Sequence, residues 1–328
     1  MKNNEVVRCM FSEWFPTFKT LTISSRVISL PDDVREYLLA DGFVLPKECE
    51  ADSSVDVRDG WTDDDEEDAE RPHFPVFHES LLSAISALGG TVFPKLTWSA
   101  PQDATWVSFN NSMECKSPSD IYLLLKSSTF VSHDLTEAFR YCDDGPVPVS
   151  HSLVLRKWTD VDPSSEFRCF VFDQTLIAIS QRHTKAYFSH LAPLNHQIIA
   201  DIGNFYRSEI CDKFPLQQYI FDVIWKNNGV VTLVDFNPFG RTTDALLFSW
   251  DSDLAQGQIS QLLSAALDKG EPTLRCLESE ADASVDPFQC YRVPQDFVHL
   301  ASGEDPEKLL DLLNLKIQQQ NEEDEDSG

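Results

Sequence analysis

The segment YIFDVIWKNNGVVTLVDFNPFG, residues 219–240, holds the side chains whose types and spacing point most directly to chemistry. Apolar residues alternate on both sides of Asn228-Gly229, a dipeptide that favours the tight type I′ turn of a β-hairpin. A two-residue turn predicts three cross-strand pairs: Asn227 with Val230, Ile224 with Leu233, and Asp222 with Asp235. Asn237 follows Asp235 by two residues, so the period of a strand places it on the same face.

Two carboxylates and a side-chain amide on one face would form a site for a hard cation. Like charges directly opposite each other destabilise a sheet unless a cation compensates them or a pKa shifts strongly. Mg²⁺ typically takes one or two carboxylates and completes its octahedron with phosphate oxygens and water. We therefore predict a Mg-nucleotide site at Asp222, Asp235 and Asn237. The alternatives are a solvent-screened edge, or a register shifted by one residue that turns the two Asp side chains apart.

The apolar residues of the hairpin favour the site over these alternatives. The predicted register puts Ile224 and Leu233 on the Asp face, and it puts four residues on the other face, namely Phe221, Val223, Val234 and Phe236. Both faces would then be covered by the rest of the protein. Charged residues on a doubly covered sheet are typical of a functional site.

Two isolated basic residues are candidates for contact with nucleotide phosphates. Lys95 lies in the apolar stretch VFPKLTW, where the alternative is an exposed Lys at the end of a strand. Arg182, in ISQRH, is the weakest candidate, because a structural or partner-facing role fits it equally well.

Two neighbouring strands carry further charges. Arg156 and Lys157 are adjacent in HSLVLRKW, so they point to opposite faces, and at least one charge must face inward or snorkel. Glu166 and Arg168 share one face of the next strand, EFRCFVF, either as a salt bridge or as part of a ligand cleft.

Several classes of nucleotide and catalytic site are excluded by missing motifs. The sequence has neither a Gly-rich P-loop nor a Rossmann fingerprint, and it has no HRD or DFG motif of a protein kinase. It also lacks a nucleophile elbow, and its eight His residues are not at metal-ligand spacing.

Composition indicates a globular protein of moderate acidity. The chain has 328 residues, 42% hydrophobic content and a net charge of −28. Residues 50–72 hold eleven acids against two Arg, and residues 304–328 hold nine acids against two Lys, which leaves −12 for the rest. An acidic body repels nucleic acid and anionic membranes, so we expect no direct binding to either.

The sequence also bounds the cellular location. No apolar run reaches the length needed to span a bilayer, and the first residues lack the apolar core of a signal peptide. The eight Cys residues form no CxxC pair or zinc pattern, so we expect reduced thiols. A cytoplasmic monomer is the simplest expectation.

The predicted elements indicate an α+β protein with two lobes. We expect an N-terminal lobe at residues 1–145 with a disordered acidic insert at about 50–72, and a C-terminal lobe at 146–303. Residues 304–328 are expected to hold the end of a helix, predicted at 308–319, and an acidic, disordered tail. Within the first lobe, residues 119–125 read as either helix or strand, and residues 133–140 are predicted as a helix with Asp134 as a possible cap. The second lobe is predicted to be built on an antiparallel sheet that ends in the hairpin.

Several long segments resemble the cell division cycle protein 123 family, in order, over most of residues 5–300. They include CMFSEWFPTFKTLTISSRVISLP, FPKLTWSAPQDATWV, SDIYLLLKSS, LVLRKW, EFRCFV with ISQRH, and DFNPFGRTTDALLFSW. The resemblance implies an ATP-grasp-like fold, in which two lobes with antiparallel sheets clamp Mg-ATP. It further implies an assembly chaperone for eukaryotic translation initiation factor 2, which acts through the C-terminal region of the gamma subunit and promotes joining of the alpha subunit.

The resemblance also assigns roles to residues. It implies that Lys95 contacts the phosphates and that the following loop lines the site through Trp98, Ala100 and Gln102. Backbone groups at Arg156, Lys157 and Trp158 would read the adenine edge, and Glu166 and Arg168 would bind ribose or phosphate. Asp222, Asp235 and Asn237 would hold Mg²⁺.

Two functional hypotheses of different class remain open at this point. The first is a binding protein, in which Mg-ATP stabilises the clamp and the clamp presents a surface to the initiation factor. The second is an ATP-grasp ligase that activates a carboxylate as an acyl-phosphate and joins it to an amine. A ligase needs an acceptor pocket beside the γ-phosphate, and the sequence reveals no residues for one.

Overall fold

The computed structural model describes residues 1–42, 44–50, 71–108, 111–145, 147–255 and 257–283. The smaller of its two sheets is antiparallel, with strand order β1-β3-β2. Its strands are β1 (Ser25–Ser29), β2 (Val92–Lys95) and β3 (Ser152–Lys157). The helices that accompany this sheet are α3 (Asp32–Leu39), α4 (Pro75–Ala87), α5 (Pro118–Lys126) and α6 (Thr129–Thr136).

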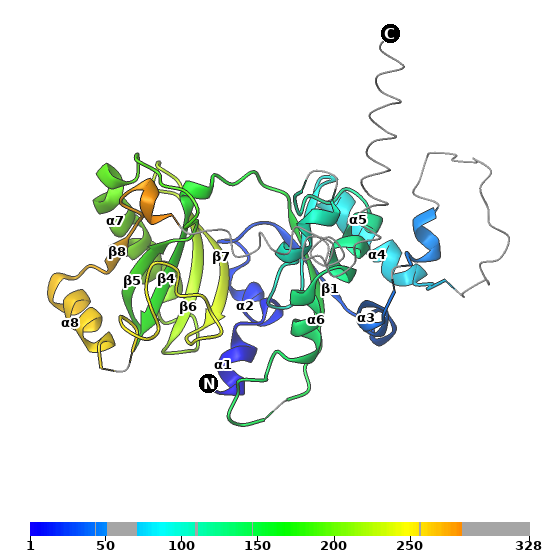
Figure 1. Cartoon of the computed structure of the whole chain (residues 1–328), viewed down its shortest axis with the longest axis horizontal. Coiled ribbons are helices and arrows are strands. Elements are labelled where there is room, and N and C mark those ends of the chain that lie inside the picture. The colour runs from blue at the N-terminus through cyan, green and yellow to red at the C-terminus, as the bar shows by residue number, and fades with distance from the viewer. Residues whose placement is uncertain (43, 51–70, 109–110, 146, 256, 284–328) are drawn as a thin grey trace, which may run out of the picture.

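The larger sheet has strand order β7-β6-β4-β5-β8, and all its neighbours are antiparallel except β5 and β8. Its strands are β4 (Glu166–Phe172), β5 (Thr175–Gln181), β6 (Tyr219–Trp225), β7 (Val231–Pro238) and β8 (Thr273–Arg275). The helices of this lobe are α7 (Asn195–Phe205), which continues into a π-helical turn at Tyr206–Ile210, and α8 (Ile259–Lys269). The predicted α+β fold with two lobes and antiparallel sheets is confirmed, and the sheets lie side by side in Figure 1.

The N-terminal helices belong to the core of the larger lobe. In α2 (Phe11–Phe18), following α1 (Asn3–Arg8), the residues Phe11, Trp14 and Phe18 recur at helical spacing and are fully buried against the larger sheet. Trp14 meets Phe236 of β7 edge to face, with ring centroids 5.4 Å apart. Figure 1 shows α2 between β7 and the smaller lobe.

The chain crosses between the lobes differently from the predicted division at residue 145. Strand β3, which the sequence assigned to the C-terminal lobe, pairs with both β1 and β2 in the smaller sheet. Leu153 and Leu155 enter the core of the smaller lobe, whereas Val154 on the opposite face contacts the core of the larger one. Pairing partners, and not the order of elements along the chain, decide which lobe a strand joins.

Capping residues explain where α5 and α6 begin, and the two corresponding predictions can be compared with them. The segment at 119–125 is helical because Ser117 and Asp120 form a capping box at the start of α5 and Pro118 occupies its first turn. The helix predicted at 133–140 is placed wrongly. Helix α6 is Thr129–Thr136, and the hydroxyl of Ser128 caps it by accepting the Val131 N–H.

The hairpin register differs from the prediction at the turn but agrees at the Asp pair. Lys226 and Val230 close a three-residue loop, so Val223 faces Leu233 and Ile224 faces Thr232, and the predicted Asn227–Val230 and Ile224–Leu233 pairs are wrong. A register shift between Asp222 and Val223 then restores the predicted Asp222–Asp235 pair.

The bulge falls at Val234 and exchanges the faces of two residues. Leu233 is buried in the core with Phe236, whereas Val234 lines the cavity described below, the reverse of the prediction for both. Ile224 lies on the cavity side as predicted.

Gly229 allows the hairpin to turn, because its φ of +82° lies in the left-handed region. We expect Gly229→Ala to lower the free energy of unfolding by about 1 kcal/mol, since an added Cβ is strained at this φ. The matched control is Gly240→Ala, where φ is not left-handed and nothing lies within 4 Å of an added Cβ. Urea denaturation of both variants checks the prediction, and equal losses would contradict it.

The remaining predictions concern membrane spans and the acidic segments. No helix within the described ranges is long and apolar enough to cross a membrane. Residues 51–70 of the predicted acidic insert, the helix predicted at 308–319 and the acidic tail lie outside the described residues.

Candidate functional site

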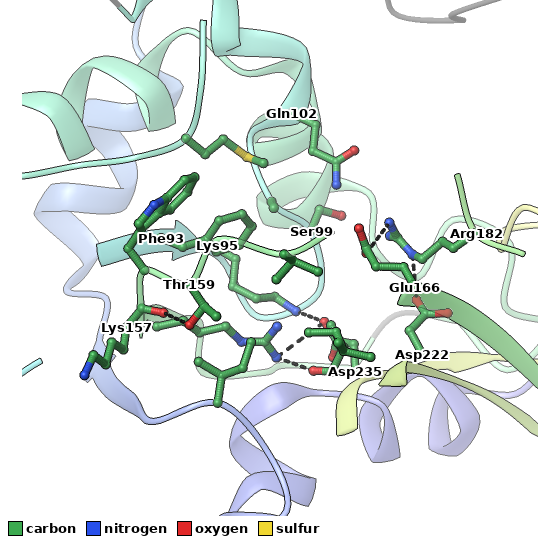
Figure 2. A pocket seen from close by; sticks show the side chains of 18 of the residues that line it. Phe93, Lys95, Ser99, Gln102, Lys157, Thr159, Glu166, Arg182, Asp222 and Asp235 are labelled. Atoms are coloured by element: carbon green, nitrogen blue, oxygen red, sulfur yellow. Dashed lines mark hydrogen bonds and ion pairs between the residues drawn. The ribbon is translucent and has the colours of Figure 1, made fainter. Parts of the chain in front are cut away.

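A cavity of about 470 Å³ lies between the two sheets, within the usual size range of small-molecule and cofactor sites. All thirteen site candidates from the sequence line it, and Figure 2 shows Lys95 of the smaller sheet pointing toward Asp235 of the larger one. The structure therefore brings the whole predicted set together, while the ligand and the role of each residue stay predictions.

The smaller sheet contributes two buried basic side chains. In the β2–β3 register Phe93 faces Arg156 and Lys95 faces Val154, so these side chains share the face that looks toward the larger sheet. Lys95 is only 2% exposed and its ammonium group donates to the carboxylate of Asp235. Arg156 is 4% exposed and donates to the backbone carbonyl of Val234.

The larger sheet contributes a paired carboxylate and guanidinium. Arg168 of β4 lies directly opposite Asp222 of β6, and its Nε and Nη2 donate to the two carboxylate oxygens at 2.8 and 2.7 Å. Its Nη1 donates to the carbonyl of Asp244 at 2.8 Å. Because this bidentate pair is buried, Arg168 fixes the orientation of the Asp222 carboxylate.

Arg182, the weakest candidate from the sequence, lies between two acidic residues of the site. It approaches Asp222 at 3.4 Å through Nε and Glu166 at 3.4 Å through Nη1, as Figure 2 shows. The same-strand neighbours Glu166 and Arg168, both in the described part of the chain, therefore pair with other partners and not with each other. Arg182 is the first residue after β5, and its backbone N–H donates to the carbonyl of Glu166 on β4. This bond continues the pairing of the two strands and places the Arg182 side chain in the cavity.

The opposed carboxylates are compensated by basic side chains of the chain itself. Asp235 has Lys95 and, at 4.0 Å, Arg156, whereas Asp222 has Arg168 and Arg182. Burial opposes ionisation of Asp222, but the two guanidinium groups outweigh it and hold its pKa below the usual value. These basic side chains lie on or next to β2, β3, β4 and β5, so the sequence of the hairpin alone does not reveal them.

Burial dominates the electrostatics of the two cations from the smaller sheet. It lowers the pKa of Lys95 below its usual value, against the raising effect of Asp235, and it lowers the pKa of Arg156 in the same way. Five basic side chains and four acidic ones line this cavity in a chain that has 54 acids and 26 bases. The cavity lining thus has one more basic than acidic side chain in an otherwise acidic chain, which favours an anion there over the rest of the surface.

The donor set fits a divalent ion held together with an anionic ligand. Asp222 and Asp235 face each other across β6 and β7, and the Asn237 amide lies 3.3 Å from the Asp222 carboxylate. Two carboxylates and an amide are oxygen donors of the kind Mg²⁺ takes when phosphates complete its shell. No group of three His, Cys, Asp or Glu side chains that could hold a metal occurs in the described part of the chain.

A second feature also fits an anion. The Nε of Arg156 is buried and has no hydrogen-bond partner among the residues that the structure describes, although the side chain lines the cavity. A buried guanidinium donor without a partner is costly, and a bound phosphate oxygen would satisfy it.

The remaining predicted residues form the rim and one wall of the cavity. Trp98 and Ala100 lie on the loop that follows β2, and Gln102 begins the 3-10 helix after it. Lys157 ends β3 and Trp158 follows it, where the chain leaves the smaller sheet. Lys157 is exposed whereas Arg156 is buried, so the prediction that one of these adjacent charges faces inward is confirmed.

Sequence reasoning missed some of the lining residues. Ser99 and Thr159 line the cavity, as Figure 2 shows, and both are neighbours of residues that were singled out. Their only sequence signal was this adjacency, because Ser and Thr are common in loops and carry no periodic pattern.

Comparison with known proteins shows the family. The model of the D123 family matches residues 14–301, which is most of the chain. The chain belongs to the D123 family. It is 43% identical to a Xenopus tropicalis protein named translation initiation factor eIF2 assembly protein, with 100% of both chains covered. A Danio rerio protein of the same name is 42% identical, with 98% of this chain and 97% of that protein covered.

A solved structure supports membership of the D123 family at the level of the fold. The structure of Cdc123 from Schizosaccharomyces pombe matches with a TM-score of 0.68 and 34% identity. The match covers 85% of this chain and 99% of that one. The resemblance to the cell division cycle protein 123 family noted in the sequence is therefore confirmed.

Proposed function

We propose that this chain binds Mg-ATP between its two sheets and acts as an assembly chaperone for the initiation factor eIF2. In the finer form of the proposal, it binds the C-terminal region of the gamma subunit and promotes joining of the alpha subunit. The printed name of the Xenopus and Danio relatives, eIF2 assembly protein, supports the choice of partner. A cytoplasmic location is part of the same proposal.

The observation that carries nucleotide binding is the charge arrangement in the cavity. Four basic side chains, Lys95, Arg156, Arg168 and Arg182, surround two opposed carboxylates inside a space of cofactor size. A polyphosphate would neutralise the cations, and a bound Mg²⁺ would neutralise the carboxylates together with the phosphates.

The remaining residues have roles in the same proposal. Asp222, Asp235 and Asn237 would hold Mg²⁺, and Lys95 and Arg156 would bind phosphate oxygens. Backbone groups around Trp158 would receive the adenine edge, and Glu166 would face the ribose or phosphates.

Isothermal titration of the purified chain with ATP, with and without Mg²⁺, tests nucleotide binding. We expect binding that strengthens when Mg²⁺ is present, because the ion removes repulsion between the phosphates and the two carboxylates. No heat with either mixture, alone or in the presence of the eIF2 gamma subunit, would contradict the nucleotide part of the proposal.

Reconstitution of eIF2 from separate subunits tests the chaperone part. We expect the chain and Mg-ATP to raise the yield of alpha–gamma complex above that of the subunits alone, with no small-molecule product. Steady turnover of ATP with an amino acid or a peptide acceptor would instead support the ligase hypothesis and overturn the chaperone.

A further inference from the structure

A buried carboxylate outside the cavity holds one of its walls. Asp134 of α6 is 4% exposed, and the sequence suggested a helix cap for it. Its Oδ2 instead accepts the backbone N–H groups of Trp98 at 3.3 Å and Ser99 at 2.7 Å, and its Oδ1 accepts the Ser99 hydroxyl at 2.7 Å. All three bonds go to the loop after β2.

This loop forms the cavity wall nearest to Lys95. Trp98, Ser99, Ala100 and Gln102 line the cavity, and Figure 2 shows Ser99 and Gln102 above the Lys95 side chain. Lys95 ends β2 three residues before Trp98, so the course of the loop fixes where this strand ends. A shift of the loop would therefore move the wall and the last residue of the strand together.

The carboxylate holds the turned backbone of the loop together with a turn bond from the Leu96 N–H to the Ser99 carbonyl, 2.8 Å long. Two consecutive N–H groups point to the same oxygen, which requires a turned backbone, because successive N–H groups of an extended strand point in opposite directions. The indole of Trp98 packs edge to face on Phe139 and His151, with ring centroids 5.9 and 6.3 Å away, and anchors the side of the loop. Asp134 holds the backbone amides of Trp98 and Ser99 in the same loop.

We propose that Asp134 is a positioning residue, which fixes the Trp98–Gln102 wall and the end of β2 for the anionic ligand of the cavity without touching that ligand. The identity of the ligand as Mg-ATP rests on the proposed function. The positioning itself rests on the three hydrogen bonds and on the burial of the carboxylate.

Hydrogen exchange of the chain without nucleotide tests the positioning directly. Asp134→Ala should speed exchange of the Trp98 and Ser99 amides by about 10-fold, because both lose their acceptor. Asp201→Ala is the matched control: Asp201 also accepts one side-chain bond, from the Trp225 indole at 2.9 Å, but it lies on α7. It should leave exchange at residues 98–99 unchanged.

Titration with Mg-ATP tests the consequence for the cavity. Asp134→Ala should weaken binding by about 10-fold, since small misplacements of a binding wall are costly. Asp134→Asn should recover most of this loss, because its amide oxygen can accept both N–H groups while its NH₂ donates to the Ser99 hydroxyl. Ser99→Ala should weaken binding about threefold, and adding it to Asp134→Ala should bring no further loss.

The outcomes separate positioning from other roles. Additive losses in the double variant, or an Asn variant as weak as the Ala variant with normal exchange at residues 98–99, would show a charge effect and overturn the proposal. If the unaltered chain binds no ATP, the proposed function fails, while the exchange experiment still decides the positioning. If Asp134→Ala does not fold, Asp134→Asn decides: near-normal exchange at residues 98–99 together with near-normal Mg-ATP binding supports the proposal, and near-normal exchange with a 10-fold loss of binding overturns it.

Discussion

Replacing Lys95 with Met should weaken Mg-ATP binding by about 10- to 100-fold, because a charge-assisted bond to phosphate is lost. The same change should lower the free energy of unfolding by less than Asp222→Ala does, because the Asp235 side chain is 16% exposed and water can partly compensate its charge. Lys95 is 2% exposed, and burial lowers its pKa, so the ammonium group is held at a desolvation cost that a Met side chain of similar size does not carry. Asp235 keeps Arg156 as a cation at 4.0 Å.

Lys157→Met is the matched control for this prediction. Lys157 also lines the cavity, but its side chain is exposed at the rim. We expect a loss of no more than about threefold in ATP affinity, because exposed charge contacts are weak. Titration and urea denaturation of both variants give the two readouts. If Lys95→Met lost several kcal/mol of stability, Lys95 would be a structural residue and its assignment to the phosphates would fail.

Asp222→Ala should have the largest effect on stability, a loss of about 3–5 kcal/mol, because it leaves a buried guanidinium without its counter-charge. Asp222 is 3% exposed and holds Arg168 through two hydrogen bonds. The variant should also lose Mg-dependent ATP binding. Chemical denaturation measures the loss of stability. Titration with Mg-ATP, at a temperature where the variant is still folded, measures the loss of binding.

An exposed pair provides the control for Asp222. Asp251 pairs with Arg241, and both side chains are at least 72% exposed. Asp251→Ala should cost less than about 1 kcal/mol, as exposed ion pairs usually do. If Asp222→Ala and Asp251→Ala lost similar free energies of unfolding, the Asp222–Arg168 pair would be solvated in spite of its burial, and the prediction would fail.

The Asp222 contribution should depend on pH with a defined sign. Its two Arg partners hold its pKa below the usual carboxyl value despite burial, so its contribution is complete above the unfolded value of about 3.9 and falls as the pH drops through the folded pKa. The stability gap between the natural chain and Asp222→Asn should therefore be constant near neutral pH and shrink in acid below about pH 4. A gap that widened in acid would contradict this assignment.

The hairpin shows how a local pattern can be correct at the site and wrong beside it. Alternation and the Asn-Gly pair predicted the Asp222–Asp235 pairing, but the turn is one residue longer than predicted and the bulge at Val234 compensates for it. The carbonyl of Val234 accepts a bond from Arg156, which comes from the other sheet. Because a long-range contact satisfies the bulge, the sequence of the hairpin alone could not place it.

The sequence by itself determined the secondary elements that carry the site and the residue types on them. Strand alternation predicted that at least one of Arg156 and Lys157 faces inward, and family-specific segments selected the lining residues that local periodicity could not. These features depend on neighbours a few residues away, which is the range over which periodicity, turns and capping act.

Only the tertiary structure decided which charges meet. Lys95 pairs with Asp235 across 140 residues, Arg168 with Asp222 across 54, and Arg182 bridges Glu166 and Asp222. The tertiary structure also shows β3 in the smaller sheet, and it shows that Asp134, predicted as a helix cap, binds the loop of the cavity wall instead. Such partners are chosen by how two buried sheets face each other, because a buried charge must find a counter-charge wherever the fold brings one close.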